Sequence, residues 1–136
     1  MFVQIISGAF VSGLDAGRIY QTWPLMGHSY FPNDVTLIGL NNLIDFNNHS
    51  LVQFYHRNLA YLITIYILFL SLYIHKKKIK YLFKPLNLVI FFLILQIILG
   101  IFTLLSGLNI YLAIAHQISS VLLVLSAVNL YYYRSK

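Results

Sequence analysis

Two histidines, His56 and His116, have the residue type and the positions that could support chemistry. His56 lies about six residues into one long apolar run, and His116 lies about five residues into another. If both runs cross a membrane as helices in the same direction, the two rings differ in depth by about 3 Å or less, since a helix rises about 1.5 Å per residue. A buried imidazole without a partner is costly in a membrane. Two imidazoles at one depth favour shared ligation, and hydrogen bonding of each ring to a neighbouring helix is the alternative.

The residues around the two histidines favour haem over a bare metal ion. Zinc, copper and non-haem iron need further ligands nearby, and the apolar runs contain no Asp, Glu or Cys. Haem held by two imidazoles takes only two side chains from the protein. Arg57 follows His56 directly and could bind a haem propionate with two parallel hydrogen bonds, or could instead extend to water. Arg18 is a second, weaker candidate for the same role.

Small and polar residues recur at helical spacing near the histidines, and two interpretations of them stay open. They could allow close packing of membrane helices, or they could leave clearance for a flat macrocycle. The residues are Gln53, Ala60 and Thr64 near His56, Gln96, Gly100, Thr103 and Gly107 in the middle run, and Ala113, Gln117, Ser120, Val124 and Ala127 near His116.

Membrane-spanning helices must position these residues. The chain has 136 residues, of which 60% are hydrophobic and 9% are charged, and that is too little charge to cover a soluble domain. Three runs, residues 51–74, 86–105 and 111–133, each supply about the 20 residues that a bilayer core requires. A fourth run, residues 1–14, would cover only about 20 Å of a core about 30 Å thick. We predict an all-α integral membrane helix bundle with three full transmembrane helices and a truncated N-terminal helix, in one membrane domain of residues 1–136.

The charges predict the topology and exclude a nucleic-acid partner. The formal net charge is +6, but lysines cluster at residues 76–84, between two apolar runs, and Arg134 and Lys136 close the chain. This placement is typical of the cytoplasmic flanks of membrane helices. The polar segment 15–50 is then an extracytoplasmic loop, and the turn at residues 106–109 lies on the same side. The sequence has no cysteine and no glutamate, which excludes thiol chemistry and removes a common general base.

The sequence resembles the haem A synthase family, and several short strings carry the resemblance. The strings occur in the family's order, cover nearly the whole chain and are specific only in combination. They are Gly8-Ala9-Phe10-Val11, Gly13-Leu14-Asp15-Ala16-Gly17, Tyr20-Gln21-Thr22-Trp23-Pro24-Leu25-Met26, Val52-Gln53-Phe54, His56-Arg57-Asn58-Leu59-Ala60-Tyr61, Gln96-Ile97-Ile98-Leu99-Gly100-Ile101, Thr103-Leu104, Leu112-Ala113 and His116-Gln117.

The resemblance implies one half of an eight-helix protein. Haem A synthases consist of two similar four-helix bundles, and this chain resembles the C-terminal half without most of its first helix. In the family that half holds haem b between two axial histidines, which correspond to His56 and His116. Arg57 and Gln117 complete our set of candidate cofactor-binding residues. The family's other half carries the substrate haem and a catalytic glutamate, which this chain lacks.

The implied function is that of part of an oxidoreductase. The family oxidises a methyl group of haem O to the formyl group of haem A for cytochrome oxidase, and electrons leave through the haem cofactor. This chain would be the electron-transfer portion, working with a separate N-terminal half or as a homo-oligomer among membrane lipids. The alternative is a non-catalytic haem-binding module or an inactive fragment. We expect a multi-pass protein of the bacterial inner membrane, and a mitochondrial inner membrane fits less well.

Overall fold

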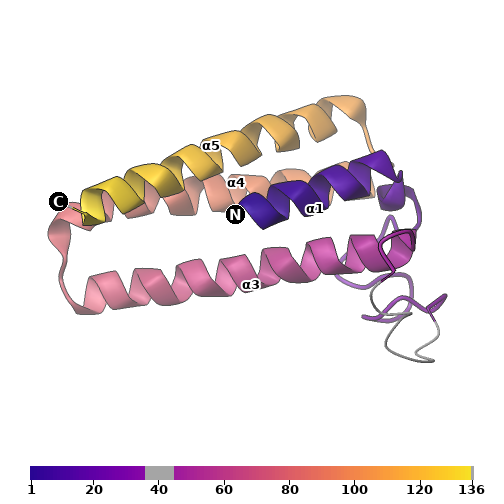
Figure 1. Ribbon diagram of the computed structural model, residues 1–136, viewed down its shortest axis with the longest axis horizontal. Helices are drawn as coiled ribbons and strands as arrows, with labels where there is room; N and C mark the ends of the chain where they lie inside the picture. Colours follow the sequence, from indigo (N-terminus) through magenta and orange to yellow (C-terminus); the bar gives the residue numbers. More distant parts are fainter. Residues whose placement is uncertain (36–44, 136) are drawn as a thin grey trace.

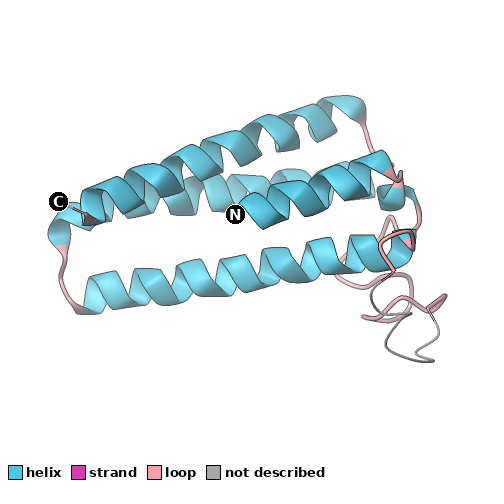
Figure 2. Cartoon of the chain, in the orientation of Figure 1, coloured by secondary structure: helices cyan, strands magenta, loops and turns pink. Residues whose placement is uncertain are grey.

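The protein is a bundle of helices, and the computed structural model describes residues 1–35 and 45–135. Its α-helices are α1 (Phe2–Gly13), α3 (His49–Lys76), α4 (Phe83–Leu105) and α5 (Ile110–Arg134). There are two short 3-10 helices: η1 (Ala16–Arg18) lies at the start of the outer loop, and η2 (Lys80–Leu82) precedes α4. Figures 1 and 2 show that the described chain is helical apart from its connecting segments. Residues 36–44 of the predicted outer loop lie outside the described residues.

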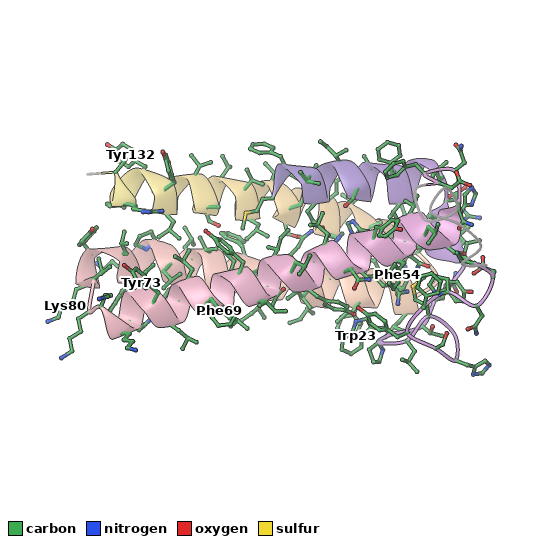
Figure 3. The ribbon with its side chains drawn as sticks, turned by 60° about the horizontal axis from the view of Figure 1, so that its bottom comes forward. Trp23, Phe54, Phe69, Tyr73, Lys80 and Tyr132 are labelled. Carbon is green, nitrogen blue, oxygen red and sulfur yellow. The ribbon has the colours of Figure 1, made fainter. Side chains whose placement is uncertain are left out.

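Three of the helices are long and apolar enough to cross a membrane, as the sequence predicted. The candidate spans are His49–Lys76, Lys80–Leu105 and Ile110–Arg134, and α1 is a shorter apolar helix of 12 residues. Large apolar side chains cover the outside of the bundle; Phe69 of α3, for example, is 67% exposed. In Figure 3 Lys80 and Tyr132 lie at one end of the bundle, and Trp23 and Phe54 lie toward the other. The predicted all-α membrane bundle is therefore confirmed.

Asparagine caps set where two of the long helices begin. The Asn48 side chain accepts a hydrogen bond from the Leu51 amide at 3.1 Å, and the Asn109 side chain accepts from the Tyr111 amide at 3.0 Å. Such caps satisfy amides that have no partner within the helix. Between α4 and α5 the chain reverses in a tight turn in which Gly107 adopts a φ of +70°. Glycine takes this left-handed conformation without a steric penalty.

The aliphatic core closes the inner half of the bundle, next to the lysine-rich turn. Its buried members come from α3, η2, α4 and α5, and they are Ile67, Ile74, Leu82, Leu86, Val89, Leu93, Leu123 and Leu130. The predicted site residues lie in the other half. Packing in the inner half therefore holds the helices together, and the outer half is left to hold polar groups.

The helices are arranged as two antiparallel pairs. Helix α1 packs mainly on α3, α4 packs mainly on α5, and α3 joins the pairs through a smaller contact with α4. In Figure 1 α3 and α5 both start at the end that carries the outer loop and run the same way. The two helices that carry the candidate histidines are therefore parallel, which the matched-depth argument required.

Candidate functional site

The two candidate histidines lie at nearly the same depth in the outer half of the bundle. His56 is the seventh residue after His49, where α3 begins, and His116 is the sixth after Ile110, where α5 begins. Counted from the helix starts, their depths differ by about 1.5 Å. Both side chains are partly buried. The structure therefore places the two histidines at one level of the bundle, on helices that run the same way.

The His56 imidazole packs against the N-terminal helix α1. A Cβ atom added at Gly8 would lie 3.2 Å from the His56 Cε1 atom, so the backbone of α1 approaches the ring closely. Ser7 Oγ lies 2.9 Å from His56 Nδ1. Gln4 Nε2 lies 3.3 Å from Nδ1 and 3.4 Å from Nε2, and it donates to the His56 carbonyl at 3.1 Å. A small residue and two polar side chains of α1 thus hold this ring.

The His116 imidazole is held in a similar way by α4. A Cβ atom added at Gly100 would lie 2.9 Å from the His116 Cε1 atom, closer than real Cβ atoms approach a neighbour. Gln96 Nε2 lies 3.2 Å from His116 Nε2, and the Ser119 hydroxyl forms a short hydrogen bond with Gln96 Oε1. His116 Nδ1 is buried and has no hydrogen-bond partner among the residues that the structure describes.

The two supporting helices carry the same short sequence, which our sequence analysis missed. Residues 4–10 and residues 96–102 both read Gln-Ile-Ile-x-Gly-x-Phe. In each copy the glutamine lies beside an imidazole nitrogen, and the glycine one turn later lies against the same ring. This repeat could have indicated that α1 packs on the histidine of α3 in the same way as α4 packs on the histidine of α5. It gives α1 a role at the site that its length alone did not indicate.

These observations fit a cofactor that takes one ligand from each helix pair. A buried polar atom without a partner costs free energy, so His116 Nδ1 marks a ring whose surroundings are incomplete. Glycines beside both rings let each imidazole lie directly against the backbone of the neighbouring helix. Among the described residues, no group of three or more His, Cys, Asp or Glu side chains comes together. A group that needs only two imidazoles, such as haem, suits this donor set.

The other predicted site residues have different surroundings. Arg57 donates from Nη2 to the Tyr20 carbonyl at 3.0 Å and from Nη1 to the Leu25 carbonyl at 3.3 Å. A guanidinium has five N–H groups, so these two bonds leave others for an anionic partner. Gln117 is exposed on the surface of α5. Arg18 lies 3.5 Å from Asp15 in an exposed ion pair.

The outer loop is fastened to the start of α3 through a carboxylate. Asp34 accepts hydrogen bonds from the Tyr20 hydroxyl at 2.7 Å and from the Ser50 hydroxyl at 2.6 Å. Burial opposes ionisation of the Asp34 carboxyl, but the bonds from Ser50 and Tyr20 outweigh it and lower its pKa. Burial, followed by the bond to Asp34, raises the pKa of Tyr20. Together with Arg57, this cluster places the loop at the outer end of the helix that carries His56.

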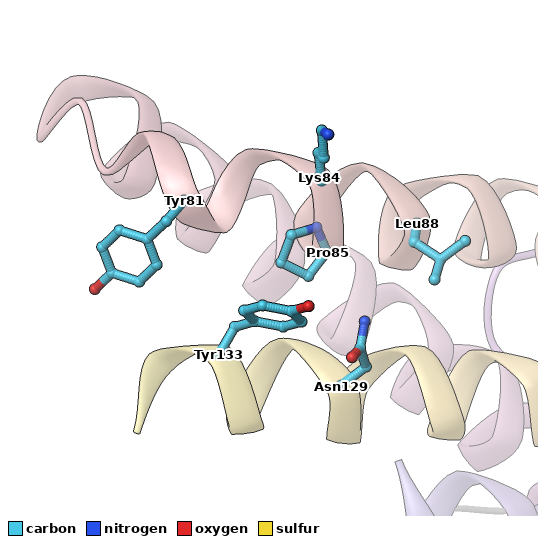
Figure 4. Close-up of a pocket in the computed structure, with 6 residues that line it drawn as sticks. All are labelled: Tyr81, Lys84, Pro85, Leu88, Asn129 and Tyr133. Atoms are coloured by element: carbon cyan, nitrogen blue, oxygen red, sulfur yellow. The ribbon is translucent and has the colours of Figure 1, made fainter. Parts of the chain in front are cut away.

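A hollow of about 290 Å³ lies at the opposite, inner end of the bundle, between α4 and α5 (Figure 4). Its lining residues are Tyr81, Lys84, Pro85, Leu88, Asn129 and Tyr133. None of them belongs to the predicted site. The hollow borders the lysine-rich turn and is separate from the two imidazoles.

Comparison with known proteins identifies the family of this chain. The family model described as cytochrome oxidase assembly protein matches residues 1–128. The chain belongs to this family. Its relatives include haem A synthases, and the part that it matches corresponds to their C-terminal half.

The relatives are considerably longer than this member of the family. The haem A synthase of Pelagibacter ubique is 46% identical over 136 residues, which cover 98% of this chain and 39% of the relative. That of Wolbachia pipientis wMel is 42% identical over 123 residues, which cover 90% of this chain and 33% of the relative. That of Maricaulis maris is 39% identical over 130 residues, which cover 94% and 38%. The chain thus spans between a third and two fifths of these relatives, and no solved structure matches it.

Proposed function

We propose that this chain is the cofactor-bearing portion of a haem A synthase and holds one haem b between His56 and His116. The observation that carries the proposal is the matched pair of imidazoles on the parallel helices α3 and α5. Each ring lies against a glycine of the neighbouring helix. Membership of the cytochrome oxidase assembly family supports the same function.

Each side chain has a separate task in this proposal. His56 and His116 would hold the haem through their imidazoles, and the glycines at positions 8 and 100 let each ring pack directly on its supporting helix. Arg57 would pair with a propionate through the N–H groups that the loop carbonyls leave free, and Gln117 completes the proposed set of cofactor-binding residues. Bound haem b supplies one-electron redox chemistry. The inner aliphatic core keeps water away from that end of the bundle.

The complete reaction needs a partner in this proposal. Oxidation of the haem O methyl group to the formyl group of haem A uses a catalytic glutamate in the family's N-terminal half, and this chain contains no glutamate. We therefore propose that an N-terminal half of the family supplies this glutamate in a bacterial inner membrane, with haem O as substrate and haem A as product. The same absence favours a second candidate, a haem-binding assembly module without catalysis or an inactive fragment.

Co-expression separates the two candidates. The chain is produced in a membrane that makes haem O, together with a four-helix N-terminal half of a haem A synthase, and the extracted haems are separated by chromatography. The enzyme proposal predicts haem A only when both halves are present, and no haem A when the partner's catalytic glutamate is replaced. His56→Ala and His116→Ala should also stop production. Absence of haem A with a correctly folded, haem-loaded pair would support the non-catalytic module instead.

A further inference from the structure

Helix α1 brings one hydroxyl group to the His56 ring, and this group has a defined hydrogen-bonding direction. We propose that Ser7 is a positioning residue that fixes His56 as the tautomer protonated on Nδ1, so that Nε2 is the ligand atom. This inference rests on the proposed function, because it assigns Ser7 a role toward the haem that His56 would bind. It also assigns a specific task to α1.

The direction follows from counting the one proton of the serine hydroxyl. Ser7 Oγ donates to the Gln4 carbonyl at 2.9 Å, and a carbonyl oxygen can only accept. The same Oγ lies 2.9 Å from His56 Nδ1. With the hydroxyl proton directed to the Gln4 carbonyl, Oγ accepts from the ring and Nδ1 carries the hydrogen.

The glutamine on the same helix is consistent with this tautomer. A neutral imidazole has one N–H nitrogen and one nitrogen with a free lone pair, so His56 Nε2 has the lone pair. The Gln4 amide nitrogen, which can only donate, lies 3.3 Å from Nδ1 and 3.4 Å from Nε2, and it bonds the His56 carbonyl at 3.1 Å. In this tautomer Nε2 is the ring nitrogen that can accept from Gln4, because Nδ1 carries a hydrogen of its own. The long distance to Nε2 makes this contact weak and easily exchanged for a metal bond.

The second imidazole lacks the equivalent support. His116 Nδ1 is buried without a partner, and position 99 of α4, which matches Ser7 in the repeated sequence, is a leucine. A ring nitrogen that donates to an acceptor holds the ligand's tautomer and increases its basicity. His56 would therefore be the more basic and more firmly oriented of the two ligands.

The test compares Ser7→Ala and Ser7→Thr with Ser12→Ala, which removes an exposed hydroxyl from the same helix. The full chain, loaded with haem, is assayed for haem release to an excess of a haem-binding acceptor protein and for its midpoint potential. We expect Ser7→Ala to release haem about tenfold faster, within the range for loss of a ligand's outer partner. Its potential should also rise, because a less basic imidazole stabilises ferric iron less. Ser7→Thr, which retains the hydroxyl, should restore both values, and Ser12→Ala should match the wild type.

Three results would overturn the role of Ser7. The first is that Ser7→Ala has the haem-release rate and midpoint potential of the wild type. The second is that Ser7→Ala releases haem faster at an unchanged potential, which would mean that Ser7 acts through packing alone. The third is that Ser7→Thr does not restore the potential. If Ser7→Ala does not fold, Ser7→Cys replaces the hydroxyl with a weaker hydrogen-bonding group and should shift the potential in the same direction. Haem that stays bound in His56→Ala would contradict the proposed function itself. Loss of haem in His56→Ala with no effect of Ser7→Ala would contradict only the role of Ser7.

Discussion

Replacement of Gly100 by alanine should move the His116 ring, and the size of the effect can be worked from the structure. The added Cβ atom would lie 2.9 Å from His116 Cε1, whereas ordinary van der Waals contact begins near 3.4 Å. The ring must therefore shift by about 0.5 Å, which is the tolerance within which a designed site must hold its groups. Overpacking costs about 1–3 kcal/mol, and alanine regains about 1 kcal/mol of helix propensity. The net loss of unfolding free energy should be about 0–2 kcal/mol, and haem affinity should fall about tenfold, equivalent to 1.4 kcal/mol.

The chain offers a matched control at the end of α1. A Cβ atom added at Gly13 would meet nothing within 4 Å, so Gly13→Ala should leave haem affinity unchanged. Both variants are measured in detergent by haem titration of the apoprotein, with unfolding followed by circular dichroism. Equal haem affinities for Gly100→Ala and Gly13→Ala would refute the reasoning, because they would show that the glycine does not set the position of the imidazole.

Three further predictions concern the loop, its arginine and a helix cap. Because the pKa of the Asp34 carboxyl is lowered, its hydrogen bonds stabilise the loop above the ordinary pKa of about 4, and this stabilisation is lost as the pH falls through the lower folded value. The fluorescence of Trp23, the single tryptophan, should therefore change between pH 5 and pH 2. Asp34→Asn should abolish that transition. Arg57→Leu should weaken haem retention in a dissociation assay while the low-spin optical bands persist, and unchanged retention would mean that the guanidinium serves only the loop carbonyls. Asn109→Ala removes the cap of α5 and should cost about 1 kcal/mol in denaturant unfolding; no measurable loss would show that the turn holds the helix start without the side chain.

The fold was predictable because its signals are local in the sequence. Three apolar runs of membrane length and one lysine-rich turn defined the spanning helices, since length and hydrophobicity decide whether a segment can cross a bilayer. The position of His56 and His116 within their runs gave the matched depth without knowledge of packing. The parallel orientation of α3 and α5 followed because the chain crosses the membrane once between them, through α4, and so returns to the side on which α3 begins.

The immediate neighbours of each imidazole were harder to predict. Which side of α1 faces α3 depends on helix rotation, and a short apolar helix without a strong polar face does not reveal it. Gln4 and Ser7 were therefore missed, although the repeated Gln-Ile-Ile-x-Gly-x-Phe sequence pointed to them. The contacts of Arg57 with the Tyr20 and Leu25 carbonyls depend on the path of the outer loop. Hydrophobic periodicity does not determine such a path.

The optical spectrum of the reduced, detergent-purified chain tests the central claim most directly. Haem held by two imidazoles is low-spin and gives sharp reduced bands, so the wild type should show them, and His56→Ala and His116→Ala should each lose them. Bands that persist in both single variants would show that the iron ligands lie elsewhere and would contradict the account.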